Sequence, residues 1–189
     1  MKKTIIIAFS ILLSTSLCYA QDEEMKNTRK GSFLIEVNTG FGEASEANTS
    51  MIFRKKSTSD QVEWAAGGEA GYFIIDDLAL KLGLGYSDLG SDDNIAGEFH
   101  WKFGAKYYLI GKVPIQLDIN GSRRTFGDDP IILDQYPIWV GIQVGYAFMV
   151  AENISIEPGL RFAQGVTVFA NASGTIMSAN LGFNIFFRN

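Results

Sequence analysis

The sequence predicts an all-β fold, an eight-stranded antiparallel up-and-down β-barrel that crosses a membrane. Three observations support this prediction. From residue 32 onward, apolar residues recur at every second position, which is the side-chain period of a β-strand. The alternating segments are mostly 9 to 15 residues long, whereas a soluble strand has about five or six residues and a tilted membrane-spanning strand needs roughly 9–11. Long and short connections alternate along the chain, as in membrane barrels.

Residues 1–20 are predicted to be an export signal. Lys2 and Lys3 precede an apolar stretch, and Cys18-Tyr19-Ala20 offers the small residues that a signal peptidase reads, so cleavage is expected after Ala20. Two alternatives are less favoured: a membrane anchor, because the run is short for spanning, and a lipid-attachment site at Cys18, because Leu17 precedes it. Cleavage after Ala20 would leave no cysteine for disulfide or thiol chemistry.

The remaining chain divides into a short tail and the barrel. Residues 21–31, QDEEMKNTRKG, are charged and lack periodicity, which predicts a flexible periplasmic tail. Residues 32–189 form the predicted barrel. No run of 18 apolar residues follows residue 20, so no transmembrane helix is expected there.

Each predicted strand sets aromatic and aliphatic residues against small, polar or charged ones. In the third strand, for example, leucines alternate with Ala79, Lys81 and Gly83. In chain order the strands are FLIEVNTGF (33–41), VEWAAGGEAGYFI (62–74), LALKLGLGYS (78–87), IAGEFHWKFGAKYYL (95–109), VPIQLDINGS (113–122), YPIWVGIQVGYAFM (136–149), ISIEPGLRFAQ (154–164) and TIMSANLGFNIFF (175–187).

The connections set the topology. They comprise residues 42–61, 75–77, 88–94, 110–112, 123–135, 150–153 and 165–174. In a meander, the short connections then share one end of the barrel and the long ones the other. Ile74 and Leu78 both belong to the apolar face, which predicts a three-residue turn at 75–77.

The apolar face is predicted to point outward into lipid and the small or polar face into the lumen. Aromatic residues near both ends of the strands predict two belts at the headgroup levels. The belt residues are Phe33, Tyr72, Tyr107, Phe148 and Phe187 near the short turns, and Phe41, Trp64, Tyr86, Phe99, Tyr136 and Phe162 near the long loops.

With its signal peptide, the hairpin YFIIDDLALKLGLGY and the closing strand ANLGFNIFF, the chain resembles the small eight-stranded outer-membrane β-barrel proteins of Gram-negative bacteria over residues 32–189. The resemblance implies a monomer in the outer membrane that contacts outer-membrane lipid and lipopolysaccharide and is inserted by the barrel-assembly machinery. Such proteins usually end on an aromatic residue, whereas Phe187 is followed here by Arg188 and Asn189. The class includes adhesins, lipid-modifying enzymes, small channels and structural proteins, so it implies no single activity.

Charged residues on the predicted lumen face are nearly balanced and form a candidate network. They are Glu36, Glu63, Glu69, Glu98, Asp118 and Glu157 against Lys81, Lys102, Lys106 and Arg161, with His100 able to join. Register places Lys81 diagonal to Glu69, and Asp118 opposite Gly104 between Lys102 and Lys106. A salt-bridged plug in a narrow lumen is favoured over an ion or proton path.

The sequence offers little for catalysis, metals or nucleic acid. His100 is the only histidine, and outer-membrane deacylases place a serine two residues after theirs, where this chain has Lys102. No catalytic, cofactor or metal site is predicted. The net charge of -5 argues against nucleic acid.

The long loops contain candidate contact residues. Arg54, Lys55 and Lys56, together with Arg123 and Arg124, would suit lipopolysaccharide phosphates or another anion. Loop 88–94, DLGSDDN, would bind a cation only weakly, and 130–133 is apolar. For each of these loops, a solvated surface loop is favoured over a binding site.

The predicted function is a structural or surface-interaction role without enzymatic activity. The alternatives are a small porin-like channel or carrier for hydrophobic or small polar solutes and a lipid A-modifying enzyme. A continuous cavity or a lateral gap at Pro158 would favour the channel. A serine and a carboxylate close to His100 and open to lipid would favour the enzyme.

Overall fold

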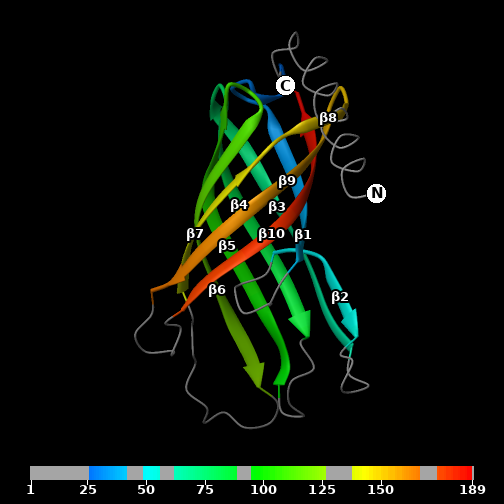
Figure 1. Cartoon of the computed structure of the whole chain (residues 1–189), viewed down its shortest axis with the longest axis vertical. Coiled ribbons are helices and arrows are strands. Elements are labelled where there is room, and N and C mark those ends of the chain that lie inside the picture. The colour runs from blue at the N-terminus through cyan, green and yellow to red at the C-terminus, as the bar shows by residue number, and fades with distance from the viewer. Residues whose placement is uncertain are drawn as a thin grey trace, which may run out of the picture.

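A computed structural model describes residues 26–41, 49–55, 62–88, 95–126, 138–166 and 174–188. Strands make up most of this part of the chain, and no helix within it is long and apolar enough to cross a membrane (Figure 1). In chain order the elements are η1 (Lys26–Thr28), β1 (Phe33–Phe41), β2 (Ile52–Lys55), β3 (Val62–Ile75), β4 (Leu78–Asp88), β5 (Ile95–Leu109), β6 (Val113–Phe126), β7 (Ile138–Gly145), β8 (Phe148–Ala151), β9 (Ile154–Gly165) and β10 (Thr175–Phe187).

The strands form one antiparallel sheet that closes on itself. The order around the wall is β1, β10, β9, β7, β6, β5, β4 and β3, and β3 pairs again with β1. β8 continues β7 along the edge of β9, and β2 adds a short strand beside β3. With β7 and β8 counted as one, the wall has the eight strands that the sequence predicts. The additional β2, within predicted loop 42–61, was not foreseen.

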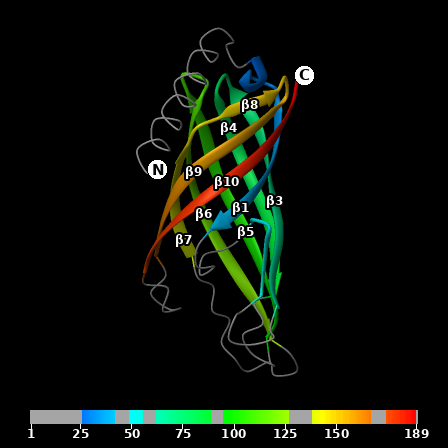
Figure 2. The same cartoon turned by 45° about the vertical axis from the view of Figure 1, so that its right-hand side comes forward.

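The two ends of the barrel differ. One end, called the turn end below, carries the three short connections β3–β4, β5–β6 and β8–β9, together with the start of β1 and the end of β10 (Figures 1 and 2). At the other end, the loop end, β1, β4, β6 and β9 finish. This is the arrangement expected of an up-and-down meander.

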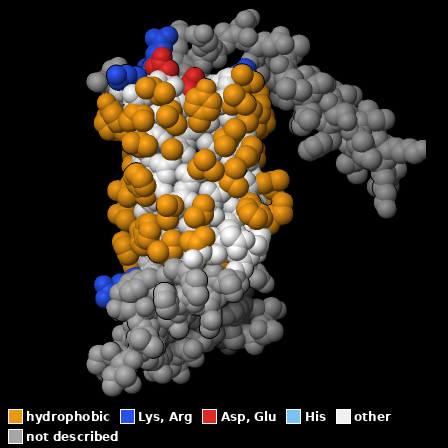
Figure 3. All heavy atoms as spheres, turned by 90° about the vertical axis from the view of Figure 1, so that its left-hand side faces the viewer, with side chains coloured by type: hydrophobic (Ala, Val, Ile, Leu, Met, Phe, Trp, Pro, Cys, Tyr) orange, Lys and Arg blue, Asp and Glu red, His pale blue; other side chains and the backbone are white. Residues whose placement is uncertain are grey.

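The in–out assignment of the third predicted strand is confirmed. In β4, Leu80, Leu82 and Leu84 are exposed on the outside, whereas Lys81 and Gly83 are buried inside. On the face drawn in Figure 3, hydrophobic side chains cover the wall and charged ones appear only near its ends. The nine belt aromatics whose side chains are described are 38–53% exposed, and Phe41 and Tyr136 lie outside the described side chains. The barrel thus presents an apolar exterior.

The β3–β4 turn corrects the parity prediction. β3 continues to Ile75, which pairs with Leu78. A bulge at Ile74 accommodates the extra residue that the parity prediction had assigned to the turn. Only Asp76 and Asp77 form the turn, and Asp77 is left-handed with a φ of 64°. The bulge leaves both Ile74 and Ile75 exposed. A three-residue turn is therefore not needed to keep Leu78 on the outer face.

Residues 26–31 differ from the predicted flexible tail, of which 21–25 lie outside the described part. Asn27 donates to the Glu152 carbonyl and accepts from Arg188 Nε at 3.1 Å. Thr28 donates to the Asp77 carboxylate, and its carbonyl accepts from the Asp77 N–H at 2.8 Å. These bonds use backbone and short polar groups, which leave no periodic signal in the sequence. The segment therefore ties two turns and the end of β10 together.

The wall is continuous around Pro158. Pro158 pairs with Leu181 of β10, and its carbonyl accepts from the Tyr146 N–H at 3.0 Å on the side of β7. The interruption between β7 and β8 falls one residue later, where the Ala147 N–H donates to the Lys112 carbonyl at 2.8 Å. A lateral gap at Pro158, which would have favoured a channel, is therefore not seen.

Candidate functional site in the barrel lumen

Two buried glutamates organise the lumen. Glu36 of β1 accepts from Lys81 Nζ and from Lys106 Nζ, both at 2.7 Å. Glu69 of β3 accepts from Lys81 Nζ at 2.7 Å and from Lys102 Nζ at 2.8 Å. Lys81 therefore bridges the two carboxylates, and the contact expected between Lys81 and Glu69 is present.

The chain of contacts continues toward the turn end. Lys106 Nζ also lies 2.5 Å from Glu157 Oε2. Glu157 Oε1 accepts from the Tyr108 hydroxyl and from the Ser155 hydroxyl, each at 3.0 Å. Five strands, β1, β3, β4, β5 and β9, thus contribute to one connected set of buried charges.

Asp118 has a different partner from the one that its register suggests. It stands opposite Gly104 as expected. Its two carboxylate oxygens accept from Arg161 Nη1 and Nη2, both at 2.7 Å, and Oδ1 accepts from Asn120 at 2.8 Å. Lys102 and Lys106 instead reach across the lumen to glutamates, because a lysine has a long flexible stem whereas the planar guanidinium matches a carboxylate fork.

The burial of these groups decides their pairing. Glu36, Glu69, Lys81 and Lys106 are at most 3% exposed. Removing a charge from water is costly unless an opposite charge and hydrogen bonds replace its hydration. Carboxylates and cations are accordingly interleaved along the interior. Glu63 lies in β3, and its side chain is outside the described set.

His100 lies toward the loop end beside a serine that sequence reasoning missed. Its Nε2 is 2.6 Å from the Ser87 hydroxyl, and Glu98 accepts from the Ser122 hydroxyl. All four side chains are buried in the lumen wall rather than facing lipid. The signal was present in the sequence, because Ser87 shares the face of Lys81 and lies diagonal to His100 across the β4–β5 hairpin.

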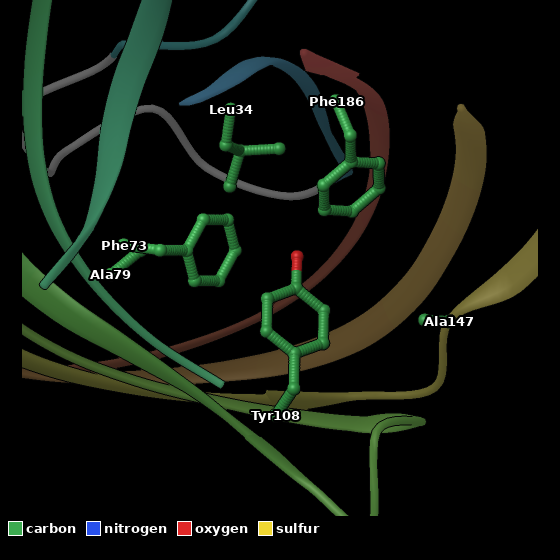
Figure 4. Close-up of a cluster of buried hydrophobic side chains, with 6 residues drawn as sticks. All are labelled: Leu34, Phe73, Ala79, Tyr108, Ala147 and Phe186. Carbon is green, nitrogen blue, oxygen red and sulfur yellow. The ribbon is translucent and has the colours of Figure 1, made fainter. Parts of the chain in front are cut away.

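An apolar cluster occupies the turn end of the lumen. Its members converge from six places in the wall, as Figure 4 shows: Leu34, Phe73, Ala79, Tyr108, Ala147 and Phe186. The Phe73, Tyr108 and Phe186 rings have centroids 6.1–6.4 Å apart, a spacing typical of favourable aromatic contacts. An interior of only small and polar residues is therefore too simple a description.

Of the other predicted contact residues, those that the structure describes lie near the loop end. Arg123 of β6 is exposed, whereas the side chains of Arg54, Lys55 and Arg124 and all of Lys56 are outside the described set. Of loop 88–94 the structure describes Asp88 alone. Within the described ranges, no group of three or more His, Cys, Asp or Glu residues has the geometry to hold a metal ion.

Comparison with known proteins shows a likeness of fold. No family model and no curated protein matches the sequence. The outer membrane protein Ail of Yersinia pestis, in a phospholipid bilayer nanodisc, matches with 10% identity and a TM-score of 0.51 over 84% of this chain and 100% of that chain. The N-terminal β-barrel domain of Pseudomonas aeruginosa OprF matches with 18% identity and a TM-score of 0.48 over 84% and 98%. Neisserial surface protein A matches with 14% identity and a TM-score of 0.48 over 85% and 100%. In fold, the chain is a small eight-stranded antiparallel β-barrel of the outer-membrane type.

Proposed function

We propose that the chain is a monomeric outer-membrane β-barrel with a structural or surface-interaction role, a closed lumen and no enzymatic activity. One observation carries the proposal: buried ion pairs run through the interior, and an aromatic cluster follows them at the turn end. An eight-stranded barrel has an interior just wide enough for side chains to fill. An interior occupied in this way favours a closed barrel over a channel or carrier.

The exterior supports a membrane location. Leucine, isoleucine and phenylalanine side chains cover the wall between two aromatic belts, which suits contact with acyl chains and headgroups. At the loop end, Arg123, with Arg54, Lys55, Lys56 and Arg124, would meet lipopolysaccharide phosphates. Insertion would depend on the barrel-assembly machinery.

Fractionation tests the location. The protein should be extracted by detergent from outer-membrane fractions, and it should migrate differently on gels before and after boiling, because a folded barrel resists unfolding by cold detergent. Recovery as a soluble periplasmic protein would contradict the proposal. In a separate assay, proteoliposomes containing the folded protein should swell in small sugars no faster than empty liposomes.

A second candidate function rests on the Ser87–His100 contact. A serine hydroxyl within hydrogen-bond reach of an imidazole is the arrangement of an acyl hydrolase, in which the imidazole takes the hydroxyl proton. A fluorophosphonate probe distinguishes the two candidates. Labelling that disappears in Ser87→Ala but persists in Ser122→Ala would favour the hydrolase, and an unlabelled folded barrel supports the non-enzymatic role.

A further inference from the structure

The short strand β8, Phe148–Ala151, is exposed on both of its faces. A strand of the barrel wall normally buries alternate side chains in the lumen, as β4 and β7 do. In β8 all four residues, FMVA, are exposed. Met149 pairs with Ser155, which is buried in the lumen wall, so Met149 lies on the lumen face and is still 39% exposed. Contact with lipid on the outside therefore explains only one of the two exposed apolar faces.

One edge of β8 is also unpaired in the described part of the chain. β8 pairs with β9 alone, and the last described bond on the other edge runs from the Ala147 N–H to the Lys112 carbonyl at 2.8 Å. Alternate residues of a strand direct their backbone groups to the same edge. The N–H and C=O of Met149 therefore point past Lys112, beyond the first residue of β6 at Val113. An edge of this kind is a template for pairing with another extended chain.

The direction of β8 sets the polarity of an added strand. β8 runs toward the turn end (Figures 1 and 2), so a strand antiparallel to it would enter from that end and lie in line with β6. Its carboxyl end would then stop at Lys112. The side chain of Lys112 is half-buried and has a flexible stem, and Ile110 in the same turn is 80% exposed. This turn thus offers an ammonium group for a terminal carboxylate and an exposed apolar side chain.

We propose that β8 binds the apolar C-terminal end of another polypeptide in the periplasm, by addition of a strand to its open edge. The inference rests on the membrane location proposed above, which puts the turn end in the periplasm. Acyl chains have no donors or acceptors for a strand edge. A second copy of this chain does not fit, because the two-fold axis of an antiparallel pair is perpendicular to the sheet and would here place the second barrel upside down in the membrane. An extended peptide supplies the backbone groups, apolar side chains for both faces and a carboxylate for Lys112.

Peptide binding to the wild-type protein tests the proposal. The probe is a fluorescent hexapeptide of valine and threonine residues with a free C-terminal carboxylate. Its binding to the folded protein in nanodiscs is followed by anisotropy, with empty nanodiscs as the blank. N-methylation of alternate backbone amides separates the two edges of the peptide: methyl groups on the edge that faces β8 should weaken binding severalfold, and methyl groups on the other edge should not. No saturable binding, or equal loss for both methylated peptides, would overturn the proposal without affecting the fold or the membrane location.

Lysine variants test the position of the carboxylate. Amidation of the peptide's C-terminus should weaken its binding to the wild-type protein severalfold, and Lys112→Gln should remove the difference between acid and amide. Lys30→Gln is the matched control, because Lys30 also lies at the turn end with an exposed side chain, and it should preserve that difference. Equal binding of acid and amide by the wild-type protein, or an undiminished preference in Lys112→Gln, would contradict the proposal. The methylated peptides decide the matter in the wild-type protein if Lys112→Gln fails to fold.

Discussion

The turn end and the loop end of this barrel are built differently in the described part of the chain. At the turn end, β1 pairs with β3, residues 27 and 28 bind two turns, and Phe73, Tyr108 and Phe186 pack across the lumen. Toward the loop end the β1–β3 ladder stops, β2 enters the wall, and buried polar side chains such as Ser87 and His100 line the interior. We infer that the turn end supplies most of the stability.

Phe186→Ala should separate the two ends most clearly. Truncating a buried phenylalanine removes transfer free energy and leaves a cavity, which costs about 3–5 kcal/mol. Phe162→Ala is the matched change at the loop end, where the ring is 45% exposed to the outside and no comparable cavity forms. Reversible unfolding in urea measures both free energies. Equal losses would contradict the difference in stability between the ends.

Leu82→Arg sharpens the contrast between outside and inside. An arginine on the lipid face near the bilayer midplane costs about 2–4 kcal/mol. Parity alone suggests that the neighbouring Gly83 tolerates serine, but a Cβ there would lie 2.9 Å from Glu69 Cγ and 3.0 Å from Thr49 Cγ2. Gly83→Ser should therefore cost about 1–3 kcal/mol by overpacking. Refolding titrations in lipid that find Leu82→Arg as stable as the wild type would contradict the placement of Leu82 on the lipid face.

Asp118→Asn tests the lumen between the two ends. The change weakens the paired hydrogen bonds from Arg161, and a hydrogen bond to a charged group contributes about 1.5–3 kcal/mol. Thermal melting in detergent should show a lower midpoint. Arg161→Met in the same chain should restore part of the loss, whereas Lys102→Met should not, because Lys102 pairs with Glu69. Rescue by the lysine change instead would mean that Asp118 pairs as its register suggests.

Asn27→Ala should have the smallest effect. It removes the hydrogen bonds to Glu152 and from Arg188 at the turn end, each worth about 0.5–1.5 kcal/mol. Lys30→Ala is the control, because Lys30 binds Asp76 through its backbone N–H alone. A loss of stability in the control, or no loss in Asn27→Ala, would argue against the idea that residues 26–31 hold the two turns and the end of β10 together.

Patterns with a strict period were predictable from the sequence. The alternation of apolar and polar residues predicted Lys81 inside the barrel and Leu82 outside it. The alternation of long and short connections predicted the up-and-down meander. Register also placed Lys81 near Glu69. These features depend on neighbouring strands alone, whose geometry is fixed by backbone pairing.

Two kinds of feature could not be predicted from the sequence: those that depend on how far a side chain extends across the lumen, and those that depend on local backbone geometry. Long side chains crossing the lumen decided that Asp118 pairs with Arg161. The bulge at Ile74 is a local shift of register, and Asn27 is held by hydrogen bonds; neither feature leaves an apolar period in the sequence. β2 is only four residues long and lies in a loop, so its insertion beside β3 had no distinct signal. The aromatic interior was overlooked because Phe73 and Phe186 adjoin the outward Tyr72 and Phe187.

Single-channel recording in planar bilayers tests the central claim, a closed lumen, most directly. The folded wild-type protein should produce no discrete steps above the bilayer leak, because ion pairs and the aromatic cluster occupy the interior. Phe73→Ala combined with Phe186→Ala is the positive comparison, since it empties the turn end and should admit intermittent current. Large, steady conductance of the wild-type protein would contradict the account and establish an open channel in its place.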